Sequence, residues 1–216
     1  MNQLAVLSTG LIFALYGMSI TVFQLNAAQE IIFKSYGRHF QFLTIQALLI
    51  STLSLLAGII SFLSTNGRLR RLRISLLALA FPLSSFVTLS YYILLFLDPR
   101  LLRTPNVPAP PITLDLSQHL LVTIVLLADF AFFAKSFRFS YLHIIQIFAF
   151  TAAYTVWIHI CHHRNGFWAY PILGKFNLQQ RIVACALAGC TLVVVYSLGT
   201  FLHRLAHTST PKSKRV

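Results

Sequence analysis

Acidic residues are scarce in this sequence. Its 216 residues include four Asp and Glu against 17 Lys and Arg, and only 10% of the residues are charged. Hydrophobic residues make up 57% of the chain, and the mean hydropathy is +0.75. A soluble domain does not carry that much apolar surface, whereas one bilayer span needs about 20 apolar residues in a row. The composition therefore excludes an ordinary soluble protein and predicts one that lies in a membrane.

Cysteine is scarce as well. Cys161, Cys185 and Cys190 all lie in or beside apolar runs, which excludes a disulfide framework and favours buried thiols. The formal net charge of +13 would indicate a nucleic-acid partner in a soluble protein. Here the basic residues lie at the ends of apolar runs, so we expect them to contact membrane lipid headgroups and expect no nucleic-acid partner.

Six stretches of the sequence are long and apolar enough to cross a bilayer. Backbone polar groups in lipid must be hydrogen-bonded within the protein, and these stretches lack the period-two alternation of a barrel strand. We therefore predict an all-α integral membrane bundle of six transmembrane helices at residues 1–203, followed by a basic tail at residues 204–216. The stretches are residues 4–25, 41–64, 74–97, 117–134, 141–161 and 182–203.

Lys and Arg are distributed unevenly between the two sides of this bundle. Ten lie on the side of the two termini, which includes a short basic turn at residues 65–73, and seven lie on the other side. Because positively charged loops stay in the cytosol, both termini are predicted to be cytosolic. The three longer loops, residues 26–40, 98–116 and 162–181, then lie on the opposite face.

The last residues of the chain bear on its location in the cell. Lys212 and Lys214, the fifth and third residues from the end, resemble the dilysine retrieval signal of endoplasmic reticulum membrane proteins. That signal works only on a cytosolic tail, which agrees with the orientation predicted from charge. We therefore predict a multi-pass protein of the endoplasmic reticulum, with a solvated basic tail as the alternative interpretation.

His119 is the most informative single residue. It opens the fourth apolar run, and Asp115, His119 and Thr123 follow at spacings of four, which places them on one stripe of a helix. A carboxylate one turn away can orient an imidazole as a base, and Thr44 holds a hydroxyl at the matching place in the second run. The alternatives are an interfacial histidine in contact with water and a threonine that only packs between helices.

A second acidic residue lies at the other end of the same run. Asp129 is about 15 Å from His119 along a helix that rises 1.5 Å per residue. We expect Asp129 to pair with Lys135, Arg138 or another basic residue at the cytosolic end and to stand apart from the His119 site.

The motif His159-Ile-Cys-His162-His163 has the form HxxHH. Histidine boxes of this form bind iron in membrane desaturases and hydroxylases, so a metal-dependent lipid oxidoreductase is one hypothesis. Those enzymes need several boxes that face the cytosol, and this box is single and lies on the opposite face. The other interpretations are a His162–His163 pair that bonds to loop backbone or lipid phosphate, or one that takes part in substrate binding. We therefore predict no metal and no cofactor.

Basic side chains surround the same face of the membrane. Such groups can attract a fatty-acid carboxylate or a phospholipid head, although helix-end anchoring is the simpler interpretation for any one of them. They are Arg38, Arg164, Lys175 and Arg181.

Four segments of the sequence carry recognisable motifs. They are Ser35–Thr44 (SYGRHFQFLT), Leu79–Pro82 (LAFP), Asp98–Arg100 and Trp157–Pro171, which follows the pattern W…HH..G.W.YP. In order and spacing, from about residue 35 to residue 200, these segments resemble the family of the androgen-induced gene 1 and androgen-dependent TFPI-regulating proteins. His119 falls at the family's histidine on the fourth helix, and Arg181 continues the match.

This resemblance implies a six-helix enzyme that hydrolyses fatty acid esters of hydroxy fatty acids. Carried over to this sequence, Thr44 is the nucleophile and His119 the general base, and a branched fatty acyl ester enters from the bilayer. The sequence departs from the family at Gln118, in its basic tail and in the Pro-rich loop. Gln118 and Asn177 are candidate oxyanion-hole donors. A non-enzymatic transporter or scaffold is the third hypothesis.

Overall fold

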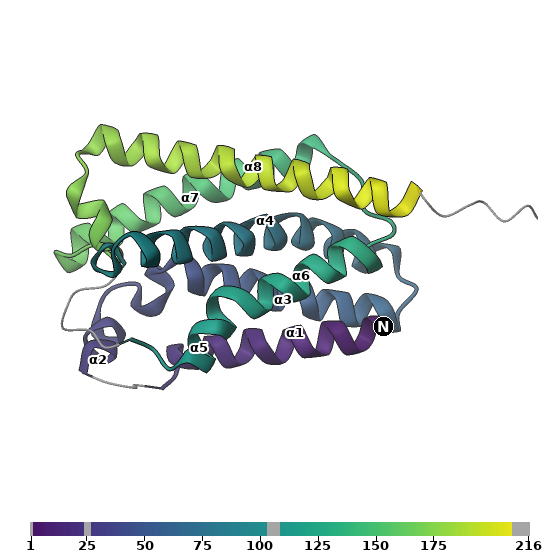
Figure 1. Ribbon diagram of the computed structural model, residues 1–216, viewed down its shortest axis with the longest axis horizontal. Coiled ribbons are helices and arrows are strands. Elements are labelled where there is room, and N and C mark those ends of the chain that lie inside the picture. Colours follow the sequence, from purple (N-terminus) through teal and green to yellow (C-terminus); the bar gives the residue numbers. More distant parts are fainter. Residues whose placement is uncertain (1, 24–26, 103–108, 209–216) are drawn as a thin grey trace, which may run out of the picture.

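The computed structural model describes residues 2–23, 27–102 and 109–208, and these residues form helices and short connections (Figure 1). The α-helices are α1 (Gln3–Met18), α2 (Ala27–Lys34), α3 (Leu43–Leu63), α4 (Gly67–Leu97), α5 (Ile112–Leu116), α6 (Val122–Ala128), α7 (Tyr141–Asn165) and α8 (Leu178–Thr208). The 3₁₀ turns are η1 (Ser19–Thr21), η2 (Arg38–Gln41), η3 (Pro99–Leu101) and η6 (Pro171–Lys175), and the π-helical turns are η4 (Ser117–Leu121) and η5 (Asp129–Phe133).

The predicted all-α bundle is confirmed. Within the described ranges six helical stretches are long and apolar enough to cross a membrane, and one of them, Ile112–Phe133, joins α5, η4, α6 and η5.

Two boundaries differ from the prediction. The basic turn at residues 65–73 is largely the first part of α4, because the Asn66 side chain caps the Arg68 amide at 2.8 Å. The fourth span begins at Ile112, so Asp115 is helical.

The start of α1 and the end of α8 lie at the same end of the bundle (Figure 1). An even number of spans requires this arrangement, which agrees with termini that share one side of the membrane. The predicted boundary after residue 203 falls inside α8, which continues to Thr208. The predicted retrieval signal at Lys212 and Lys214 lies outside the described residues.

Helices α1, α3, α4 and α6 pack together, and α7 and α8 form a pair on the far side of α4 (Figure 1). Between membrane helices the attraction comes from close packing more than from the hydrophobic effect, so small residues lie at the crossings. A Cβ atom at Gly10 would lie 2.5 Å from Cγ1 of Val125, and one at Gly199 would lie 2.6 Å from Cε1 of Phe81. Glycine therefore lets α1 approach α6, and lets α8 approach α4.

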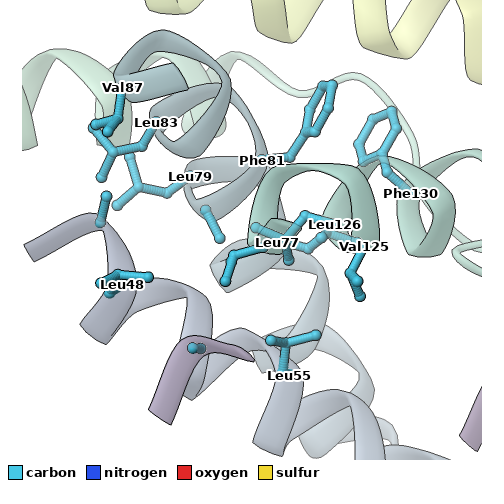
Figure 2. Close-up of a cluster of buried hydrophobic side chains, with 14 of the residues drawn as sticks. Leu48, Leu55, Leu77, Leu79, Phe81, Leu83, Val87, Val125, Leu126 and Phe130 are labelled. Atoms are coloured by element: carbon cyan, nitrogen blue, oxygen red, sulfur yellow. The ribbon is translucent and has the colours of Figure 1, made fainter. Parts of the chain in front are cut away.

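The core lies along the α3–α4 contact. Leu48 and Leu55 on α3 are buried against α4, and Figure 2 shows Leu48 toward the Val87 end of α4 and Leu55 toward the Leu77 end. A buried hydrogen bond of 2.9 Å between the hydroxyls of Ser51 and Ser84 joins the same two helices. These contacts set the register of α3 on α4, on which the site described below depends.

A buried ion pair joins the helices at the end of the bundle where the termini lie. Nη2 of Arg73 on α4 donates to the Asp129 carboxylate at 2.6 Å, and both side chains are almost inaccessible. Asp129 thus pairs with a basic residue, as expected, but the partner is Arg73 and neither Lys135 nor Arg138. With its amide turned to suit its neighbours, Gln3 accepts from both terminal nitrogens of Arg73 at 2.9 and 3.0 Å. Three helices therefore converge on one charge pair.

Candidate functional site

The end of the bundle opposite the termini, which we call the distal end, carries the short elements α2, η2, η3 and η6. The turn before η2 depends on Gly37, whose φ of 78° lies in the left-handed region. A Cβ atom there would lie 2.7 Å from Sγ of Cys161, so a larger residue is excluded by space as well. Glycine therefore allows η2 to pack on α7 directly before the first turn of α3, where Thr44 lies.

His119 is buried at the distal end, with 7% of its surface exposed. Its Nδ1 atom lies 3.1 Å from the main-chain oxygen of Asp115 and 3.3 Å from the Asp115 carboxylate. Both neighbours are acceptors, so Nδ1 carries the proton and Nε2 presents its lone pair. This is the tautomer that a general base needs.

Tyr91 on α4 holds this pair from one side. Its ring stacks on the imidazole of His119 with centroids 3.5 Å apart and planes 3° from parallel. Its hydroxyl donates to the carboxylate of Asp115. A single tyrosine thus fixes the plane of the imidazole and the position of the carboxylate.

His119 lies in the π-helical turn η4 of the fourth span. A π turn leaves main-chain groups without their usual partners, and such turns are frequent at functional sites. The hydroxyl of Thr88 donates to the main-chain oxygen of His119 and lies 2.8 Å from the hydroxyl of Thr123. Thr123 therefore lies on the predicted side of the helix, and the Thr88 hydroxyl bridges it to the main chain of His119. The Gln118 amide donates to the Gly17 main-chain oxygen at 2.8 Å, which ties η4 to α1.

Thr44 lies in the first turn of α3 beside Tyr170. The Leu43 amide donates to the Tyr170 hydroxyl at 2.9 Å, and the Tyr170 ring meets Phe42 edge-on at 5.7 Å. Burial raises the pKa of the Tyr170 phenol above its ordinary value, and hydrogen bonds with Thr44 and Leu43 oppose that rise. Tyr154 donates to the main-chain oxygen before this turn, at Gln41, over 3.1 Å. Two partly buried tyrosines thus hold the start of α3.

The register of α3 on α4 relates Thr44 to His119. Ser51 and Ser84 are paired, and a step of seven residues is about two helical turns. Two turns from this pair toward the distal end lead to Thr44 on α3 and Tyr91 on the antiparallel α4. Thr44 therefore shares a seam with the tyrosine that covers His119. Both residues are described, and no hydrogen bond joins Thr44 to His119 in this state.

The HxxHH motif forms an aromatic stack. His162 lies flat on Trp168 with centroids 3.8 Å apart, His159 meets the same ring edge-on at 5.2 Å, and the Arg181 guanidinium lies 4.3 Å from its centre. Nδ1 of His159 lies 2.7 Å from the main-chain oxygen of Thr155. Across the described ranges, no group of three or more His, Cys, Asp or Glu is arranged to hold a metal ion. His159, His162 and Arg181 thus pack around Trp168.

The remaining predicted residues lie apart from Thr44. Arg38 lies over the Phe33 ring at 4.7 Å, while Arg164 and His163 are exposed on α7. Asn177 caps α8, because its side chain accepts from the Gln180 amide at 2.9 Å. Sequence reasoning missed three residues of the site: Tyr91, Thr88 and Tyr170. Polar groups inside or beside an apolar run were the available signal for them.

Comparison with known proteins supports the resemblance seen in the sequence. Residues 5–204 match the profile of the family described as FAR-17a/AIG1-like protein. A protein of Schizosaccharomyces pombe, described as a UPF0641 membrane protein, is 30% identical over 175 residues, which are 80% of this chain and 78% of the yeast protein. No solved structure matches the chain.

Proposed function

This chain belongs to the FAR-17a/AIG1-like family, and from that premise we propose that it is an integral membrane hydrolase of fatty acid esters of hydroxy fatty acids. Thr44 is the nucleophile and His119 the general base. The observation that carries the proposal is the pair of Asp115 oxygens beside Nδ1 of His119, because two acceptors there favour a proton on Nδ1 and leave the lone pair of Nε2 to act as a base. The base also lies at the same end of the bundle as Thr44.

The reaction has two halves. Nε2 of His119 takes the proton of the Thr44 hydroxyl while its oxygen bonds to the ester carbonyl carbon. The tetrahedral intermediate collapses, the bond to the alkoxy oxygen breaks, and His119 returns the proton to the departing hydroxy fatty acid. Water then attacks the acyl-threonine with His119 as base, releases the fatty acid and restores the Thr44 hydroxyl. No cofactor enters either half.

Thr44 and His119, the proposed catalytic dyad, come into reach of each other and of the ester when the Tyr91 side chain moves. Its ring stacks on the imidazole, and the register places it on the same seam as Thr44. Rotation of this side chain away from His119 makes room for the ester carbonyl between base and nucleophile. Substrate reaches the seam laterally from the bilayer, where its acyl chains already lie.

Tyr170 is the proposed oxyanion donor. Its hydroxyl accepts from the Leu43 amide and is hydrogen-bonded with Thr44, so its proton is in place to turn toward an oxyanion formed on the ester at Thr44. The two donors that the sequence indicated are engaged elsewhere, Gln118 with α1 and Asn177 at the start of α8. The endoplasmic reticulum, with both termini in the cytosol, is the proposed location.

The test compares membranes that contain Thr44→Ala, Thr44→Ser or His119→Ala in an assay with a branched fatty acyl ester. We expect Thr44→Ala and His119→Ala to lose at least about a hundredfold in rate, and Thr44→Ser to keep activity because it keeps the hydroxyl. A fluorophosphonate probe should label the native protein and fail to label Thr44→Ala.

Thr52→Ala is the matched control, since Thr52 is a buried threonine of the same helix that bonds to the main-chain oxygen of Leu48 at 2.8 Å. It should hydrolyse the ester at the native rate. Native rates in both Thr44→Ala and His119→Ala would refute the dyad.

A further inference from the structure

Every acidic side chain of this protein already faces a partner. The chain has only four Asp and Glu, and all four lie in the described ranges. The pairs are Glu30–Lys34 at 2.6 Å, Asp98–Arg100 at 3.0 Å, Asp115–His119 at 3.3 Å and Asp129–Arg73 at 2.6 Å. No acidic side chain is left to neutralise the other basic groups of the distal end. Their counter-anions must come from outside the protein.

An open groove of about 760 Å³ lies along α7, beside the start of α8. This size falls within the range of about 300–1,000 Å³ that is usual for small-molecule sites. The groove's apolar side chains are between 41% and 60% exposed, so the part of the chain that the structure describes leaves them largely open. They are Val156, Ile160, Leu178 and Ile182.

One part of this groove is basic. Arg164 and His163, both exposed, line it together with Tyr36 and follow the apolar residues toward the end of α7. The Arg164 guanidinium lies 5.7 Å from the centre of the Tyr36 ring, where its donors stay available. Because α7 ends at Asn165, these groups lie where the span meets the headgroups, and Val156 and Ile160 lie deeper along the same helix.

We propose that this groove is a binding site for a long-chain fatty acid. Its ionised carboxylate lies at Arg164, which offers the planar fork that matches a carboxylate, and its acyl chain lies along the apolar residues of α7 and α8. A single basic end and a single groove fit a one-chain lipid better than a phospholipid, which carries two chains. The site does not involve Thr44 or His119, so it stands whether or not the protein is a hydrolase.

The two tryptophans of the chain report on this groove. Trp157 lies 5.8 Å from the ring of Tyr36, and Trp168 lies 5.2 Å from the ring of His159. Both Tyr36 and His159 line the groove. A fatty acid brominated along its chain quenches tryptophan on contact, so its binding is measurable without a label on the protein.

The experiment titrates dibromostearate into the full-length protein in lipid nanodiscs and follows tryptophan fluorescence. We expect saturable quenching, and in Arg164→Gln an apparent Kd about tenfold higher, as for loss of one charge-assisted contact. Lys34→Gln is the control, because it removes a basic residue of the same end that is already paired with Glu30. It should bind like the native protein.

Two further titrations separate the alternatives. The methyl ester of the same brominated acid keeps the chain without the charge and should quench more weakly. Added phosphatidylcholine without bromine should not relieve the quenching by the acid. Equal quenching by acid and methyl ester, or an unchanged Kd in Arg164→Gln, would overturn the proposal. Thr44→Ala should bind dibromostearate normally, so a failed hydrolase and a failed fatty-acid site give different results.

Discussion

Asp115→Asn is the change that most directly tests how His119 is held. In the native protein Nδ1 of His119 has two acceptors, the Asp115 carboxylate at 3.3 Å and its main-chain oxygen at 3.1 Å. The asparagine variant keeps the main-chain acceptor, so the tautomer of His119 survives. What is lost is the difference between a charged and a neutral acceptor, about 1–1.5 kcal/mol. At about 1.4 kcal/mol per decade this predicts a fall in kcat of about tenfold.

The size of this loss distinguishes two arrangements. In the serine protease triad the carboxylate alone sets the tautomer, and its loss lowers kcat by about 10⁴. A fall of that size in Asp115→Asn would refute the assignment of the tautomer to the main-chain oxygen, and native kcat would refute any orienting role for the carboxylate. The assay is ester hydrolysis at saturating substrate, with unfolding measured in parallel. Tyr91→Phe is the matched control, because it keeps the stacked ring, removes the hydroxyl that bonds to Asp115 and should cost less.

Three further changes test other parts of the structure. Tyr170→Phe should lower kcat by about a hundredfold, as for loss of an oxyanion donor, and should keep fluorophosphonate labelling because Thr44 remains; native kcat would remove Tyr170 from the site. Asp129→Ala should destabilise the fold in reversible detergent unfolding by about 3–5 kcal/mol, since it leaves Arg73 buried without its partner. Combining Arg73→Met with Asp129→Leu should recover most of that loss. A double variant no more stable than Asp129→Ala would contradict this explanation. Burial lowers the pKa of His39 below 6.5, so as the pH falls below that value the unfolded segment binds a proton more readily than the folded one and the fold is weakened. The hydrogen-exchange protection of residues 29–41 should therefore drop between about pH 7.5 and about pH 5.5, and it should not drop in His39→Gln.

The six spans could be predicted because length and apolar composition alone define them. The end of α4 that carries Arg68 could not be predicted in this way, since a helix continues beyond the bilayer wherever a cap such as Asn66 stabilises its first turn. The start of the fourth span at Ile112 was missed for a similar reason. Prolines ahead of a helix are compatible with its first turn, so the Pro-rich stretch up to Pro111 did not mark where the helix begins.

The candidate site could be predicted in part. The contact between Asp115 and His119 follows from their spacing, because residues four apart meet on any helix. The stacking of Tyr91 on His119 could not be predicted, since it depends on how α4 lies against the fourth span. The same holds for Tyr170, whose place beside the first turn of α3 depends on how the loop after α7 packs. Contacts between helices depend on how the helices are aligned along one another, and a single sequence does not reveal that alignment.

The two π turns of the fourth span connect its chemistry to its structure. Each contains a buried ionisable residue, His119 in η4 and Asp129 in η5, and each residue contacts a side chain of α4. A π turn adds one residue to a helical turn, so the residues beyond it rotate by about 100° relative to an uninterrupted helix. One apolar span thus presents a base at one end and an ion-pair partner at the other to the same neighbouring helix, and hydropathy, which scores composition and not phase, does not register its wide turns.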